Sequence, residues 1–203
     1  MPITSAEGRS ADSAAAPASP EAAEPIMLEL VDEDGRTIGT AEKVSAHLAP
    51  GRLHRAFSVF LFDEQGRLLL QRRALGKYHS PGVWSNTCCG HPYPGELPFV
   101  AAARRTAEEL GLAPELLRAA GTVRYNHPDP LSGLVEQEYN HLFVGTVRAT
   151  PEPDPEEVEE YAYVTPAELE KLMSEVTFSA WFMTVLDTAR PAVREVIGAG
   201  AGW

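Results

Sequence analysis

Residues 86–111 read NTCCGHPYPGELPFVAAARRTAEELG and give the strongest structural signal in the chain. A loop rich in Gly and Pro leads into a helical pattern. In that pattern Pro98 suits the first helical turn, and Gly111 suits a position just past the helix end. The same stretch carries two thiols, an imidazole, two arginines and two adjacent carboxylates. It therefore predicts a helix over residues 98–110 with chemically useful side chains on the helix and on the loop before it.

Strand patterns lie on both sides of this segment. Alternating or continuous apolar runs, bounded by turn residues, predict strands at 26–31, 55–62, 67–72, 121–125, 137–148 and 161–164. Residues 151–157 form a linker rich in proline and acid. Two more helices are expected, at 166–174 and at 178–196, the second interrupted by Pro191. These elements predict an α/β (α+β) fold in which a mixed β-sheet is sandwiched between helices, with an N-terminal strand extension.

Length and composition point to one domain. The chain has 203 residues, of which 44% are hydrophobic and 23% charged, as is ordinary for a globular protein. We expect a single domain at 26–198, a disordered tail rich in Ala, Pro and Ser at 1–25, and a flexible C-terminus at 199–203. Two adjacent cysteines give no disulfide framework, which favours a cytoplasmic location. No apolar run approaches 18 residues, so no membrane association is expected.

Charge is distributed unevenly along the chain. The formal net charge is −12, which argues against a nucleic-acid binder. Residues 26–151 nevertheless hold 13 basic residues against 14 acidic ones, whereas residues 152–175 hold nine acidic residues and one lysine. This pattern fits a central region that receives an anionic small molecule, although a solvated acidic face explains the acidic segment equally well.

Three histidines and two glutamates form a candidate metal site. Glu136 and Glu138 are two residues apart in a strand pattern, so their carboxylates leave the same face. His47 and His54 precede and enter the strand at 55–62, and His91 follows the cysteines. Neutral imidazoles together with carboxylates suit Zn²⁺, Mn²⁺ or Mg²⁺. The alternatives are scattered surface or core histidines and a solvated strand face. The remaining histidines are interpreted as structural or surface residues: His79, His127 and His141.

The two cysteines differ in their expected orientation. In an extended segment Cys88 and Cys89 point in opposite directions, so only one of them faces a site. Cys89 is either a small buried hydrophobe or a reactive thiol whose pKa is lowered by a nearby cation.

Four basic residues form a candidate diphosphate site: Lys43, Arg73, Lys77 and Arg105. Arginine matches phosphate oxygens with two parallel hydrogen bonds, and lysine supplies a point charge. Arg105 and Glu109 are four residues apart on the predicted helix and so share a face. Each basic residue taken alone is more simply a surface charge, and only convergence in space makes the four a site.

Together these motifs resemble the type 1 isopentenyl-diphosphate isomerase family, whose members have a Nudix fold. Residues 90–111 nearly reproduce the Nudix box, with Arg105 where Nudix hydrolases have a glutamate. The likeness covers about residues 26–190. The other matching segments, in chain order, are 42–47, 52–58, 72–77, 81–84, 89–92, 135–138 and 178–181.

The resemblance implies an enzyme that converts isopentenyl diphosphate into dimethylallyl diphosphate. The double bond moves through one protonation and one deprotonation. By this likeness, Cys89 and Glu138 are the catalytic groups on opposite faces of the substrate carbons. Tyr125 assists Glu138, and Trp181 faces the cationic intermediate. Which of the two catalytic groups donates the proton stays open.

The resemblance also implies two metal ions. The first is a divalent ion (Mn²⁺, Zn²⁺ or Mg²⁺) held by His47, His54, His91, Glu136 and Glu138. The second is Mg²⁺ on the substrate diphosphate, held by Glu109 and the backbone carbonyl of Cys89. The four basic residues contact that diphosphate. The expected partner is this small molecule, with no nucleic acid or membrane. The expected state is a monomer, with a dimer as the alternative.

Two other functions compete with the isomerase interpretation. The first is a Nudix hydrolase acting on a nucleoside diphosphate derivative. It needs several acidic ligands in the box, of which Arg105 removes one, and it leaves Cys89 and the histidines without a role. The second is a catalytically inactive metal- or ligand-binding module. The presence of Cys89, Glu109, Glu136 and Glu138 argues against such decay.

Overall fold

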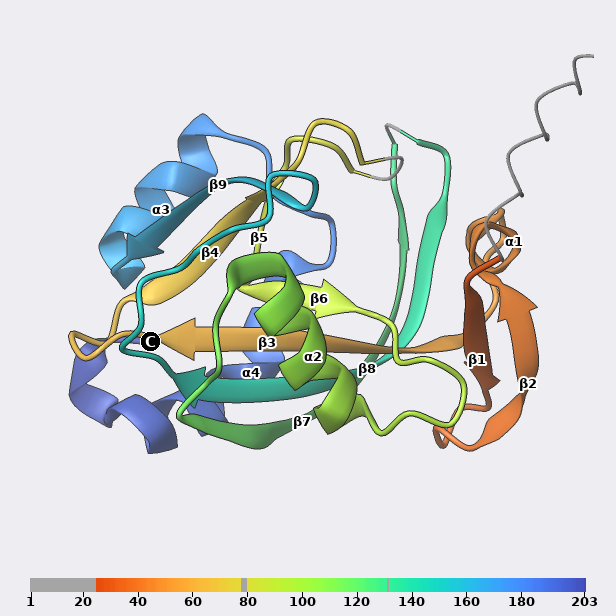
Figure 1. The fold of residues 1–203 in the computed structure, drawn as a ribbon, viewed down its shortest axis with the longest axis horizontal. Coiled ribbons are helices and arrows are strands. Elements are labelled where there is room, and N and C mark those ends of the chain that lie inside the picture. The colour runs from red at the N-terminus through yellow and green to blue at the C-terminus, as the bar shows by residue number, and fades with distance from the viewer. Residues whose placement is uncertain (1–24, 78–79, 131) are drawn as a thin grey trace, which may run out of the picture.

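In the computed structural model, residues 25–77, 80–130 and 132–203 are described, and their nine strands form one mixed sheet. Figure 1 shows α2 on one face of the sheet and α4 on the other, so the predicted sandwich is confirmed. The strands are β1 (Met27–Val31), β2 (Thr37–Glu42), β3 (His54–Phe62), β4 (Leu68–Arg73), β5 (Trp84–Ser85), β6 (Cys88–Gly90), β7 (Leu116–Pro128), β8 (Val135–Thr146) and β9 (Val158–Val164). The helices are α1 (Lys43–His47), α2 (Pro98–Leu110), α3 (Pro166–Glu175), α4 (Phe182–Ile197) and the 3₁₀ turn η1 (Ala199–Ala201).

The central strand β3 divides the core in two. It pairs in parallel with β8 and antiparallel with β6, and almost all of its side chains are buried. Because strand residues alternate between faces, Phe57 and Val59 pack in the core beneath α2, while Phe60 and Phe62 pack in the core beneath α4. A near-continuous apolar strand is what a sheet covered on both faces requires.

Helix α2 forms where the sequence predicts it. Pro98 occupies the first turn, where its missing N–H costs no helical hydrogen bond. Gly111 ends the helix in the left-handed conformation, with φ of 65°, and its N–H donates to the carbonyl of Ala107. A Cβ at Gly111 would also lie 3.0 Å from the side chain of Glu152. Gly111 therefore both stops the helix and lets the following linker pass close by.

The N-terminal extension is a hairpin with a short helix. Strands β1 and β2 pair along their length, and Leu30 joins the hairpin to His54 of β3. Figure 1 shows this hairpin and α1 at one end of the molecule. Glu42 caps α1 by accepting hydrogen bonds from the backbone N–H groups of Val44 and Ser45. Neither β2 nor α1 was predicted, although α1 delivers Lys43 and His47 to the site.

Two expectations for the C-terminal region need correction. The helix predicted at 178–196 begins at Phe182, because Phe178 forms a bridge with Trp84, and it continues through Pro191 without interruption. The C-terminus was expected to be flexible, but Trp203 is only 3% exposed and packs in the core beneath α4. Its indole N–H donates to the carbonyl of Gly66 at 2.8 Å. The large apolar ring explains this anchoring.

Other boundaries shift by a few residues or lie beyond the described chain. Strand β7 begins at Leu116 rather than at 121, and β9 begins at Val158 rather than at 161. The expectation of a tail at 1–25 falls almost wholly outside the described residues.

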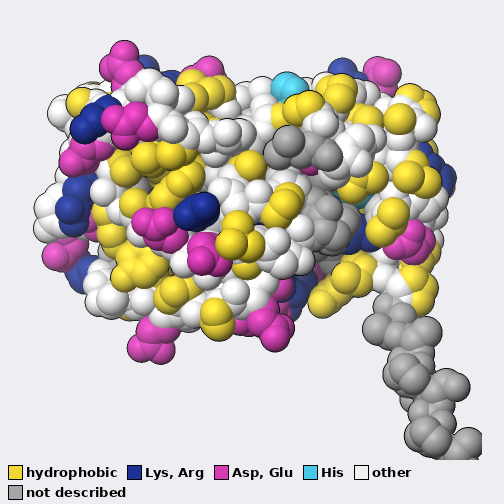
Figure 2. Space-filling model, turned by 90° about the horizontal axis from the view of Figure 1, so that it is seen from above, with side chains coloured by type: hydrophobic (Ala, Val, Ile, Leu, Met, Phe, Trp, Pro, Cys, Tyr) yellow, Lys and Arg dark blue, Asp and Glu magenta, His cyan; other side chains and the backbone are white. Residues whose placement is uncertain are grey.

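Among the helices that the structure describes, none is long and apolar enough to cross a membrane. Figure 2 shows acidic and basic side chains alternating around the rim of one face, with hydrophobic ones gathered on the side where α3 and β9 lie.

Candidate active site

A cavity of about 290 Å³ collects most of the candidate residues from distant parts of the chain. Of the thirteen site residues predicted, the eleven that line it are Lys43, His47, Arg73, Lys77, Cys89, His91, Arg105, Glu109, Glu136, Glu138 and Trp181. His54 and Tyr125 are not among its lining residues, but both contact residues that are. The convergence that the sequence alone did not establish is therefore present.

The three histidines and two glutamates form one cluster. Their possible ligand atoms all lie within 4.8 Å of one another. Nε2 of His91 lies 3.2 Å from Nε2 of His54 and 3.1 Å from Oε1 of Glu138. Nε2 of His47 lies 3.3 Å from Oε2 of Glu136. Two ligands bound about 2.1 Å from one ion and roughly at right angles are separated by about 3 Å, so these spacings fit a shared divalent cation.

Backbone carbonyls orient two of the imidazoles. Nδ1 of His47 lies 2.7 Å from the carbonyl of Lys43, and Nδ1 of His54 lies 2.7 Å from the carbonyl of Arg52. A carbonyl only accepts, so the hydrogen is on Nδ1, which leaves the Nε2 lone pair directed into the cluster. This is the outer support that metal-binding histidines usually have. The donor set therefore fits a divalent metal in its chemistry as well as in its spacing.

Burial sets the charges in the cluster. It lowers the pKa of His54 to about 4 and that of His91 to about 3, so both rings are neutral near pH 7. For His47, burial lowers the pKa, but the hydrogen bond and charge of Glu136, together with the Lys43 carbonyl and the charge of Glu138, raise it above its usual value. Burial, together with the charge of Glu138, raises the pKa of Glu136 to about 7. The pKa of Glu138 is lowered despite burial, because His91 hydrogen-bonds to it. The two buried carboxylates therefore have too little positive charge nearby for both to be ionised easily.

Two side chains support Glu138 from behind. Tyr125 lies opposite Glu138 in the β7–β8 pairing and donates its hydroxyl hydrogen to the carboxylate. Burial and the charge of Glu138 raise the pKa of Tyr125 well above its usual value, so the phenol keeps its proton. The amide of Asn140 donates to the same carboxylate at 2.9 Å and to the Tyr125 oxygen at 3.0 Å. Asn140 was missed, although its position two residues after Glu138 places it on the same strand face.

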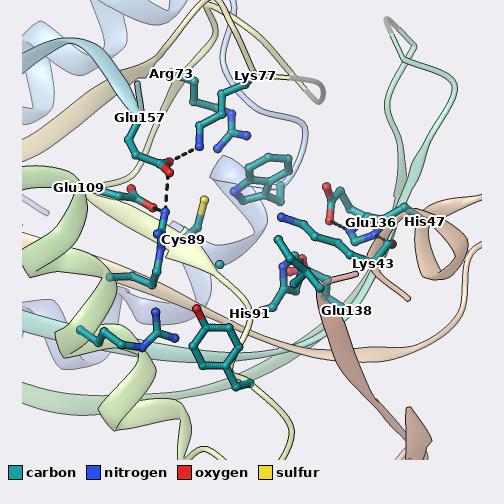
Figure 3. Close-up of a pocket in the computed structure, with 16 residues that line it drawn as sticks. Lys43, His47, Arg73, Lys77, Cys89, His91, Glu109, Glu136, Glu138 and Glu157 are labelled. Atoms are coloured by element: carbon teal, nitrogen blue, oxygen red, sulfur yellow. Dashed lines mark hydrogen bonds and ion pairs between the residues drawn. The ribbon is translucent and has the colours of Figure 1, made fainter. Parts of the chain in front are cut away.

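The cysteines point to opposite sides of the sheet, as predicted. Cys88 is buried in the core beneath α2, whereas Cys89 lines the cavity and pairs with Ser58 of β3. The hypothesis of a lowered thiol pKa is wrong: burial raises the pKa of Cys89 to about 12, which outweighs the opposite effect of Arg73. The thiol is therefore protonated near pH 7. Figure 3 shows Cys89 and Glu138 on different sides of the cavity.

Arg73, Lys77 and Arg105 gather at one end of the cavity, together with two carboxylates, whereas Lys43 reaches into the cavity from the side of His47 and Glu136 (Figure 3). Arg105 donates to Glu109 at 2.6 Å and lies 3.1 Å from Oε2 of Glu157, which also pairs with Lys77 (Figure 3). The pKa of Lys43 is lowered first by burial and then by the neighbouring cations Arg73 and Lys77. Crowded cations in a partly buried cavity favour an anionic ligand.

Sequence reasoning also missed Gln71 and Glu157. The buried Gln71 amide donates to Glu109 at 2.9 Å and to the carbonyl of Thr87 at 2.9 Å, which fixes the Glu109 carboxylate. Glu157 was assigned to a linker because acids surround it in the sequence. The strand that positions it was predicted to begin at 161 rather than at Val158, so no sequence signal marked Glu157.

Two of the other histidines, His127 and His141, lie outside the cluster, as interpreted from the sequence. His141 contacts the guanidinium of Arg55 at 3.1 Å. His127 packs against the ring of Tyr125 and hydrogen-bonds with Thr184. His79 lies outside the described residues.

The fold and the cavity define a Nudix-domain protein, and the family model described as NUDIX domain matches residues 52–182. The crystal structure of DR0079 from Deinococcus radiodurans superposes with a TM-score of 0.65 at 20% identity, covering 81% of this chain and 98% of that one, which shows the fold alone. A protein of Streptomyces griseus named Isopentenyl-diphosphate Delta-isomerase is 78% identical over 89% of this chain and 92% of its own length. A protein of the same name from Streptomyces coelicolor is 72% identical over the full length of both. The chain belongs to the isopentenyl-diphosphate Delta-isomerase family.

Proposed function

We propose that the chain interconverts isopentenyl diphosphate and dimethylallyl diphosphate by proton transfer. The name shared by its close relatives supports this reaction. One structural observation carries the proposal. A protonated thiol at Cys89 and a buried carboxylate at Glu138 line one cavity from different sides, and its far end is basic.

The reaction needs an acid and a base at two different carbons. Protonation of the terminal CH₂ group of the alkene gives a tertiary carbocation, and loss of a proton from the carbon on the other side of that centre gives the product. One proton enters and one leaves, so the formula is unchanged. Cys89 and Glu138 fill these two roles, one as donor and the other as acceptor, and they exchange roles in the reverse direction. Tyr125 and Asn140 position the Glu138 carboxylate.

The carbocation must be protected from water. Trp181 lines the cavity and is only 5% exposed. An indole face attracts a cation by about 2 kcal/mol or more once water is removed, and it offers no nucleophile. We propose Trp181 for this role, which accounts for a large aromatic ring at the start of α4 beside charged residues.

Two divalent ions complete the proposed site. His47, His54, His91, Glu136 and Glu138 would hold Mn²⁺, Zn²⁺ or Mg²⁺, and Glu109 with the Cys89 carbonyl would hold Mg²⁺ on the diphosphate. A bound cation supplies the positive charge that lets buried carboxylates ionise together. The four basic residues would then bind the remaining phosphate oxygens. Metal analysis of the purified protein before and after chelation tests the first site.

We further propose that the domain, whose core includes Trp203, works as a monomer in the cytoplasm. Two free cysteines support a reducing compartment. Size-exclusion chromatography with light scattering tests the monomer, and a dimer mass would refute it.

The deciding experiment is product analysis. We expect metal-loaded protein to convert isopentenyl diphosphate into dimethylallyl diphosphate, and we expect chelation to stop the conversion. Release of phosphate from nucleoside diphosphate derivatives without isomer formation would instead support a hydrolase. Failure to transform either substrate would support a binding module.

A further inference from the structure

Glu157 lines the cavity although nothing in the sequence marked it as a candidate. It lies in the turn before β9. Its carbonyl accepts a hydrogen bond from the N–H of Ala74 at 3.0 Å, and its own N–H donates to the carbonyl of Asp154 at 3.0 Å. These bonds fix the Glu157 backbone beside the end of β4, the strand that carries Arg73. The carboxylate is therefore held at the basic end of the cavity by secondary structure.

Its carboxylate pairs with two of the basic residues. Oε2 contacts Nζ of Lys77 and lies 3.1 Å from Nη2 of Arg105 (Figure 3). Burial raises the pKa of Glu157, but the hydrogen bond from Lys77 and the charge of Arg105 together lower it by more. The net pKa is below its usual value, so the group is ionised near pH 7. The Glu157 carboxylate thus occupies hydrogen-bond donors of Lys77 and Arg105 that a phosphate ligand would also need.

A phosphate cannot bind these donors while Glu157 keeps them. Two anions a few ångströms apart in a partly buried cavity repel each other. Without Glu157, however, Lys77 would lose its carboxylate partner and Arg105 would keep only the carboxylates of Glu108 and Glu109. Repulsion among Lys77, Arg105 and the neighbouring Arg73 would therefore increase. The Glu157 carboxylate therefore stabilises these cations in the free protein and opposes the binding of an anionic ligand.

We propose that Glu157 is the resident counter-anion of the diphosphate end of the cavity. It holds Lys77 and Arg105 toward the cavity in the free protein and yields them to the phosphates of the substrate. This role rests on the proposed function, because it assigns a diphosphate to that end. Glu157 is then a specificity-determining residue. A diphosphate carries enough charge to replace it, whereas a small single anion such as orthophosphate competes poorly.

Substitution Glu157→Gln tests the proposal, because it keeps the shape of the side chain and removes its charge. Glu160→Gln is the matched control: Glu160 lies in the same strand region, is 56% exposed and pairs with Arg72 outside the cavity. Binding of inorganic pyrophosphate and of orthophosphate is measured by calorimetry, without added divalent cation. We expect Kd to fall about tenfold for pyrophosphate in Glu157→Gln, as for loss of one nearby like charge, and to fall more for orthophosphate. Glu160→Gln should match the unsubstituted protein.

Unchanged or weaker pyrophosphate binding by a folded Glu157→Gln protein would overturn the proposal. Weakening that occurs only when Mg²⁺ is added would also overturn it, since Glu157 would then act through the cation on the diphosphate. Circular dichroism verifies that each variant is folded. These titrations need no turnover, so tighter pyrophosphate binding in a protein that fails to isomerise would preserve this inference while refuting the proposed function.

Discussion

The His–Glu cluster and the basic end of the cavity both gather charged side chains, but they hold them differently. In the cluster the side chains are almost fully buried, and backbone carbonyls fix the imidazoles of His47 and His54. At the basic end, Lys77, Arg105 and Glu157 keep 22–25% of their side-chain surface exposed and are held by ion pairs between side chains, including those of Arg105 with Glu108 and Glu109. The first region is built in advance for a small ion, and the second can exchange one anion for another.

Substitutions in the His–Glu cluster should reduce activity the most. Replacing His54 by Ala removes a fully buried candidate metal ligand. We therefore expect the protein to lose its bound divalent metal and turnover to fall by at least ~10²-fold. Metal content is measured by mass spectrometry alongside the assay. The control is His141→Ala, which alters a histidine outside the cluster. A His54→Ala protein with full metal content would show that the cluster is not a metal site.

The thiol lies between the two regions. Replacing Cys89 by Ala removes a proposed proton carrier, so turnover should fall by at least ~10²-fold, the lower range for acid–base catalysis. Cys88→Ala is the natural control, because its thiol is buried on the other side of the sheet; it should cost about 1 kcal/mol of stability and little activity. Retained turnover in Cys89→Ala would remove the thiol from the mechanism.

Substitutions at the basic end of the cavity should weaken substrate binding more than they slow the chemical step. Replacing Lys77 by Ala removes one of several cations, so KM for isopentenyl diphosphate should rise about tenfold while kcat changes little. Lys171→Ala, an exposed lysine on α3, serves as the control. A fall in kcat at unchanged KM would mean that Lys77 acts in the transition state instead.

The smallest effect is expected outside both regions. Deletion of residues 1–25 removes no chemical motif, so kcat and KM should stay within about twofold of the full-length values. Steady-state kinetics of the shortened protein checks this. A large loss of turnover would assign the tail a role in the reaction.

The sequence predicted those parts whose signal is local. Pro98 and Gly111 bracket α2 because each residue has a backbone preference that acts without tertiary contacts. By contrast, β2 has mostly exposed residues and therefore shows no apolar run, and α1 is short and capped by Glu42 rather than by a common capping residue. Trp203 was misjudged because only tertiary packing shows that a C-terminal ring has a place in the core.

The site follows the same division. The five cluster residues were predicted from the two glutamates on one strand face, from the chemistry of imidazole and carboxylate ligands, and from the resemblance to the isomerase family. Gln71 and Glu157 were missed because each acts through a partner distant in sequence, Glu109 and Lys77 respectively, whereas Asn140 was missed although it contacts the nearby Glu138. The choice between a buried Cys89 and a thiol with a lowered pKa stayed open for a related reason. Burial, which the sequence does not show, outweighs the neighbouring cation.

The most direct test of the central claim is turnover of isopentenyl diphosphate in D₂O, followed by mass spectrometry and NMR of the product. If Cys89 and Glu138 transfer protons on two sides of the substrate, the dimethylallyl product should carry deuterium in the methyl group that derives from the terminal CH₂. Dimethylallyl diphosphate formed without any deuterium, or no such product from fully metal-loaded protein, would contradict the account.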